Sequence, residues 1–225
     1  MTVSTLTYLD GYCERAGNPD LWAEPLNAVT NLAFIIAAYL VWRALRKLPD
    51  HTFARVGDIY LLIASLTAIG IGSFIWHSFA GHTVLADVIP IALFINIYLI
   101  AALKRLFGFG WTRTVSLWGI YQLAGMAAQI YLPPNTLHGT VMYLPTLGAL
   151  GIMTGALVRK QAPEGAVFAK VLSVWVLSLM FRTIDLDVCS AIPIGTHFLW
   201  HLLNAWVLWR LSMVLVARAQ SLPTS

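Results

Sequence analysis

The sequence contains seven long apolar stretches separated by short polar breaks, and this pattern limits the fold more than any other feature. The stretches lie at 26–46, 56–79, 84–106, 112–132, 137–158, 166–184 and 195–217. A helix that crosses a membrane needs about 20 predominantly apolar residues. Because each stretch has about this length, the sequence predicts an all-α membrane protein with seven transmembrane helices.

The composition supports a lipid environment. Of the 225 residues, 59% are apolar and 11% are charged, whereas a soluble domain carries about a quarter charged residues. These values exclude a soluble globular enzyme and a disordered chain. Seven helices with short loops use nearly the whole length, so we expect one domain over 1–225, with an outer tail at 1–25, a helical bundle at 26–217 and a cytoplasmic tail at 218–225.

The basic residues predict the orientation of this bundle. Twelve of the 14 would lie on one face if the N-terminus were outside: Arg43, Arg46, Lys47, Arg55, Lys104, Arg105, Arg113, Arg159, Lys160, Lys170, Arg210 and Arg218. The positive-inside rule therefore predicts an outer N-terminus and a cytoplasmic C-terminus.

Since the net charge of +4 is not gathered in one patch, we expect no nucleic-acid partner. We expect a multi-pass integral protein of the plasma (inner) membrane rather than of an internal membrane.

Several ionisable residues fall at one depth, the outer ends of the predicted spans. His197 and His201 are four residues apart on one helical face, and two histidines at this spacing can share a zinc ion. His77 is the candidate third ligand, with Ser73 one turn before it and Asp87 as the nearest strong carboxylate on that side. Placing an ionisable group within a span costs free energy unless the group is paired or bound to a metal. Such residues are therefore functional candidates.

Each of these residues also has an ordinary structural role available. A single histidine inside a membrane protein is more often a hydrogen-bonded interior residue than a metal ligand. Ser73 follows two glycines, Gly70 and Gly72, and its small side chain would let two helices approach closely. Asp87 would serve equally well as the N-cap of the span at 84–106. The sequence alone leaves these alternatives open.

Taken in order, the motifs resemble the alkaline ceramidase family, within the heptahelical group that includes the progestin and adiponectin receptors. They run from about residue 8 to 210: Tyr12-Cys13-Glu14, the stretch from Trp22 to Asn31 with Glu24, Ser73-x-x-x-His77, Asp87 followed by Pro90, Ile184-Asp185 with Cys189, and His197-x-x-x-His201. The resemblance implies a zinc amidase in which His77, His197 and His201 hold zinc beside Ser73 and Asp87.

The resemblance also implies a calcium site in the N-terminal tail. The carboxylates available for it are Asp10, Glu14 and Glu24, but Gly11 and Ala16 stand where the family has Asp and Asn. Calcium prefers six to eight oxygen ligands, many of them from carboxylates. We therefore expect calcium to bind weakly or not at all unless Asp10 takes the missing place.

The residues predict a mechanism for this chemistry. Three histidines leave one zinc position open for water. Asp87 would take the proton of that water and pass it to the leaving amine. Ser73 would donate a hydrogen bond to the developing oxyanion. The apolar helices suit a lipid amide substrate, and the resemblance selects ceramide or a related N-acyl lipid cleaved to a sphingoid base and a fatty acid. The alternatives are a non-catalytic heptahelical receptor that contains zinc and a membrane subunit that binds haem.

The two cysteines are Cys13 and Cys189, and both fall on the predicted outer side. Disulfides form where the compartment is oxidising, so we expect a disulfide that ties the tail to the segment before His197. Two free thiols are the alternative, because sequence does not establish pairing.

Overall fold

The computed structural model describes residues 11–79, 83–133 and 136–221, and all regular elements within these ranges are helical. The α-helices are α2 (Pro25–Thr30), α3 (Leu32–Leu45), α4 (Phe53–Ser78), α5 (Val84–Arg105), α6 (Trp111–Tyr131), α7 (Leu144–Arg159), α8 (Gly165–Ile184) and α9 (His197–Ser221). Two 3-10 segments, η1 (Thr136–Tyr143) and η2 (Leu186–Val188), precede α7 and follow α8.

Six of the predicted spans are long and apolar enough to cross a membrane, which indicates a multi-pass membrane protein. The predicted span at 112–132 forms α6, a helix of 21 residues, but it is not among these six. Its polar side chains explain the difference, because α6 contains Arg113, Gln122 and Gln129 among its apolar residues. The predicted span at 137–158 is also not one regular helix, since η1 forms its first part and α7 begins only at Leu144.

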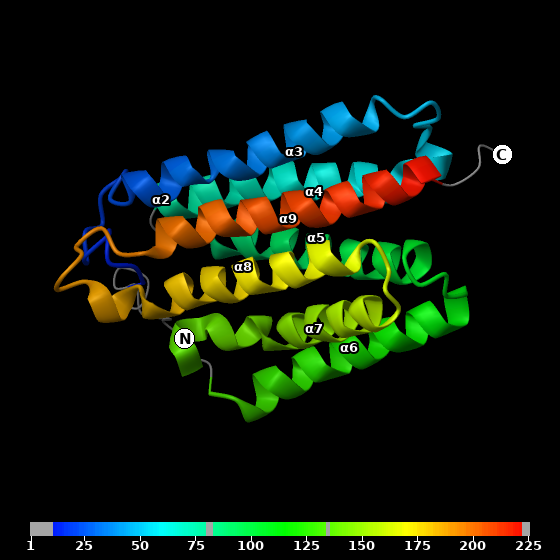
Figure 1. Ribbon diagram of the computed structural model, residues 1–225. Coiled ribbons are helices and arrows are strands. Elements are labelled where there is room, and N and C mark those ends of the chain that lie inside the picture. The colour runs from blue at the N-terminus through cyan, green and yellow to red at the C-terminus, as the bar shows by residue number, and fades with distance from the viewer. Residues whose placement is uncertain (1–10, 80–82, 134–135, 222–225) are drawn as a thin grey trace.

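The long helices lie side by side along roughly one common direction, which runs from left to right in Figure 1. Each packs against its neighbours in the chain, and α9 closes the ring by packing against both α3 and α8. Contacts of α9 with α4 and α5 place it near the centre, and it is the most buried of the six apolar helices. We call the end where α4 finishes and α9 begins the site end, and the other the opposite end.

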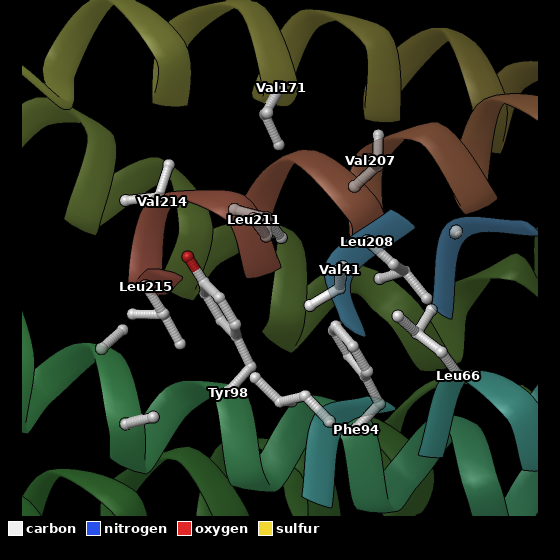
Figure 2. Close-up of a cluster of buried hydrophobic side chains, with 14 of the residues drawn as sticks. Val41, Leu66, Phe94, Tyr98, Val171, Val207, Leu208, Leu211, Val214 and Leu215 are labelled. Carbon is white, nitrogen blue, oxygen red and sulfur yellow. The ribbon is translucent and has the colours of Figure 1, made fainter. Parts of the chain in front are cut away.

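The core consists of apolar side chains from several helices that meet around α9 (Figure 2). Leu66 of α4, Phe94 of α5 and Val171 of α8 lie there with Leu211 and Leu215 of α9, and all five are almost fully buried. This packing holds the two histidine-bearing helices, α4 and α9, in a fixed relation to each other.

A salt bridge closes the opposite end of the bundle. The guanidinium of Arg105 donates to both carboxylate oxygens of Asp58 at 2.6 and 2.7 Å and to the carbonyl of Arg55. Arg218 of α9 in turn donates to the carbonyl of Arg105. These bonds join α4, α5 and α9 away from the histidines.

Candidate metal centre

Three histidines meet at the site end of the bundle. His77 lies in the last turn of α4, His197 is the first residue of α9, and His201 lies one turn further along. Each histidine offers one ring nitrogen, and these three nitrogens lie within 4.8 Å of one another. The three residues are only 0 to 2% exposed. The structure thus brings together the three side chains that the sequence singled out, although they come from helices more than 100 residues apart.

Hydrogen bonds orient two of these rings. Nδ1 of His77 lies 2.5 Å from Oε2 of Glu24. Nδ1 of His201 lies 3.0 Å from the Thr30 hydroxyl, which itself donates to the carbonyl of Leu26 at 2.8 Å. Both contacts therefore assign the proton to Nδ1, by inference from the network, and leave the Nε2 lone pair free. This is the arrangement of a metal-binding histidine whose other nitrogen is held by an oxygen.

One ring nitrogen of each histidine is buried without a hydrogen-bond partner among the described residues: Nε2 of His77, Nδ1 of His197 and Nε2 of His201. A buried polar atom without a partner costs about 1–3 kcal/mol. Three such nitrogens facing one small space fit a metal ion, and zinc is typically bound by three protein ligands and one further ligand at a catalytic site. The donor set therefore fits zinc.

Glu24 is the centre of a buried network behind His77. Its carboxylate also accepts a hydrogen bond from Nε of Arg15 at 2.5 Å and one from Nδ2 of Asn27 at 3.1 Å. The side chains of Arg15 and Glu24 are 0% and 1% exposed, and Arg15 also donates to the carbonyl of His77. Burial alone would raise the pKa of Glu24, but the hydrogen bonds and charge of its partners outweigh it and lower that pKa.

Glu14 stabilises the start of α2. Its two oxygens accept the backbone N–H groups of Leu26 and Asn27 at 2.7 and 2.8 Å, which satisfies donors that a helix N-terminus leaves free. Partial burial raises the pKa of Glu14, against the effect of these hydrogen bonds. Of the expected calcium ligands, Glu14 and Glu24 thus have protein partners, and Asp10 lies outside the described residues. Calcium binding stays a prediction.

Ser73 and Asp87 meet where α4 and α5 pack closely. Gly72 makes this approach available, because a Cβ there would collide with the carbonyl of Ala86. Oγ of Ser73 and Oδ1 of Asp87 are both buried, and within the described structure neither makes a hydrogen bond of ordinary geometry. Asp87 also interacts electrostatically with His77.

The alternative role of Asp87 as a helix cap does not appear in the structure. Thr83 occupies the N-cap position of α5, and no side chain makes a capping hydrogen bond there. Asp87 lies four residues further on, in the first turn of α5, and its carboxylate interacts with Ser73 and His77 instead.

Asp185 positions the third histidine. Its Oδ1 accepts the N–H groups of Thr196 and His197 at 2.6 and 2.8 Å, and its Oδ2 accepts the N–H of Cys13 at 3.0 Å. Gly195 has φ of +66°, and a Cβ at this residue would collide with the Asp185 carboxylate. The carboxylate therefore satisfies the first N–H groups of α9 and fixes where His197 begins the helix.

A disulfide between Cys13 and Cys189 reinforces this arrangement. It joins the N-terminal tail to the segment between α8 and α9, which is the pairing expected from the sequence. The ring of Tyr12, next to Cys13, consequently lies against two of the histidines, 4.9 Å from His77 and 4.1 Å from His197 between ring centroids.

Sequence reasoning missed several residues of the site. Arg15 and Thr30 were not singled out, and Tyr12 and Asp185 were named within motifs but given no role. A basic residue in a tail beside two glutamates was a usable signal for Arg15. No sequence signal distinguishes Thr30 from other threonines in the apolar spans, because its role depends on the packing of α2 against α9.

Comparison with known proteins adds no assignment. The sequence matches no protein-family model and none of the curated proteins with which it was compared. The interpretation of the site therefore depends on its own geometry and on the motifs described above.

Proposed function

We propose that this chain is a zinc-dependent hydrolase of lipid amides that resembles the alkaline ceramidases. The observation that carries the proposal is the set of three buried ring nitrogens without partners, one on each of His77, His197 and His201. Three histidine ligands with an open fourth position are typical of catalytic rather than structural zinc sites.

Other side chains hold the three ligand residues in place. Glu24 and Thr30 fix the rings of His77 and His201, and Asp185 fixes the first turn of α9 at His197. Partners of this kind typically change metal affinity or activity by a factor of about 10 to 100. A zinc ion held there would supply Lewis acidity, which makes water nucleophilic near neutral pH and polarises a carbonyl.

Asp87 and Ser73 have separate tasks in this proposal. Oδ1 of Asp87 accepts the proton of the attacking water and later returns it to the leaving nitrogen, which is general base and then general acid catalysis. Oγ of Ser73 donates a hydrogen bond to the oxygen on which negative charge develops. Both atoms are buried, and the two side chains interact with each other, which places the proton acceptor beside the oxyanion donor.

The apolar interior of the bundle supports a lipid substrate. An apolar cavity of about 60 Å³ lies among α5 to α9, and Tyr143 in its wall packs against Trp200, which stacks on the ring of His197. A hydrocarbon tail gains about 0.8 kcal/mol for each CH₂ that it buries. A long-chain amide is the natural substrate, and the resemblance selects ceramide among the N-acyl lipids.

The proposed topology has seven spans, with α6 as the additional one, an outer N-terminus and a cytoplasmic C-terminus. It is supported by the length of α6 and by its packing between α5 and α7. The basic residues support the orientation, because they concentrate at the opposite end of the bundle. We place the protein in the plasma (inner) membrane.

The test is hydrolysis by purified protein. We expect fatty acid release from a panel of N-acyl lipids, loss of release after zinc chelation and recovery on zinc addition. His201→Ala should abolish release, whereas His138→Ala, which changes an exposed histidine paired with Asp187, should not. A zinc-loaded protein that releases no fatty acid from any N-acyl lipid would contradict the proposal and favour a non-catalytic receptor.

A further inference from the structure

A second, larger cavity lies far from the histidines, between α5, α6 and α7. Its volume is about 610 Å³, within the range of about 300–1,000 Å³ that small-molecule sites occupy. Ile120 of α6 and Ile152 of α7 line it, and both are strongly exposed. The cavity is therefore a groove that opens on the outer surface of the bundle, where the apolar helices meet lipid.

The groove has the length of a hydrocarbon chain. Its wall on α7 runs from Pro145 to Lys160, 15 residues apart, which corresponds to about 22 Å at about 1.5 Å per residue. Half of the hydrocarbon core of a bilayer measures about 15 Å. Gly148 forms part of the floor, and a Cβ at this residue would meet no atom within 4 Å, so the groove is open rather than filled by side chains.

Two cationic side chains lie where the groove reaches the opposite end of the bundle. Arg113 stacks on the ring of Phe109 at 3.8 Å, and the ammonium of Lys160 lies 5.6 Å from the ring of Phe107. All four residues line the groove. The two exposed cations therefore lie over the aromatic rings at the mouth of the groove, in the geometry of cation–π contacts.

Neither Arg113 nor Lys160 has a carboxylate partner in the part of the chain that the structure describes. The nearby acidic residues of α4 and its preceding loop are engaged elsewhere, since Asp58 pairs with Arg105 and Asp50 with Arg55. The groove thus combines an apolar channel with a positive mouth whose two cations form no salt bridge among the described residues, and a ligand that matches both is an anionic amphiphile.

We infer that this groove binds an anionic phospholipid of the adjacent leaflet. One acyl chain lies between α6 and α7 against Gly148, and the phosphate lies between Arg113 and Lys160, where the guanidinium donates two parallel hydrogen bonds to it. A phospholipid fits better than a free fatty acid, because the groove is open along its length and accommodates a molecule whose second chain stays in the bilayer. This inference is independent of the proposed hydrolysis.

The test is lipid binding measured by native mass spectrometry of the purified protein. Phosphatidylglycerol is titrated against phosphatidylcholine with the same acyl chains, and oleate is titrated separately. We expect one phosphatidylglycerol to be retained in preference. The double variant Arg113→Gln/Lys160→Gln should weaken it by roughly 20- to 30-fold, at about 1 kcal/mol for each cation near the membrane surface.

Two matched controls separate the site from general effects. Arg43→Gln/Arg46→Gln removes the same charge from exposed residues at the opposite end of the bundle and should leave binding unchanged. Gly148→Leu should block both phospholipids, whereas Gly119→Leu, where added atoms also meet open space but outside the groove lining, should not. Equal retention of the two phospholipids, equal losses in the Arg43/Arg46 control, or retention of oleate alone would overturn the inference.

Discussion

Replacement of Arg15 by methionine tests the network behind His77 most severely. The substitution replaces the aliphatic stem of Arg15 with an unbranched apolar chain and removes the guanidinium that contacts Glu24 at 2.5 Å. Since both side chains are at most 1% exposed, the Glu24 carboxylate would stay buried beside His77 without its cation. Removing one partner of a buried pair costs about 3–5 kcal/mol.

That cost predicts a large fall in thermal stability. For a chain of this size 1 kcal/mol shifts Tm by about 2–4 °C, so Arg15→Met should lower Tm by roughly 6 to 20 °C. The measurement is thermal unfolding in detergent with zinc removed, so that metal binding does not add to the signal. Arg43→Met, at an exposed residue of α3, is the control and should leave Tm within about 1 °C.

A second variant distinguishes charge balance from simple loss of packing. Arg15→Met/Glu24→Gln removes both charges and leaves an amide oxygen to accept the proton of His77 Nδ1, so much of the lost Tm should return. Zinc affinity, measured by chelator competition, should still fall by about 10- to 100-fold, because a neutral amide holds the ligand less well than a carboxylate. A double variant no more stable than Arg15→Met, or an Arg15→Met protein with unchanged Tm, would refute this reasoning.

Three further predictions concern the site. Asp87→Asn should keep zinc and Tm but lower turnover by about 10²- to 10⁴-fold, and a lower Tm with normal turnover per folded molecule would instead indicate a structural role. Gly195→Ala should destabilise the folded protein in thermal unfolding, since its Cβ would displace the Asp185 carboxylate that holds the start of α9; an unchanged Tm would contradict the close contact. A calcium titration should leave activity and Tm unchanged, because Glu14 and Glu24 already have protein partners, and a calcium-dependent rise in either would show that the tail binds the ion.

The sequence predicted the parts of this fold that depend on local composition. The apolar runs located the long helices because lipid-facing helices need apolar residues along most of their length. The i, i+4 spacing of His197 and His201 indicated one shared face, because residues four apart lie on the same side of a helix. The apolarity of α6 was overestimated, since Arg113, Gln122 and Gln129 lower it below that of the other spans.

The parts that sequence reasoning missed depend on contacts between distant segments. Arg15 and Glu24 lie nine residues apart, but they act on His77 only because the tail folds back over the end of α4. In the same way, Asp185 reaches the start of α9 across a turn whose shape requires Gly195. Hydropathy and spacing describe each helix separately and carry no information about such contacts.

The central claim is that His77, His197 and His201 form one zinc site, and X-ray absorption at the zinc edge tests it most directly. The claim predicts one zinc per chain with three imidazole nitrogens at about 2.0–2.1 Å and one further oxygen ligand, and His201→Ala should lose bound zinc. Protein that binds no zinc, zinc coordinated by oxygen alone, or an unchanged spectrum in His201→Ala would contradict the claim.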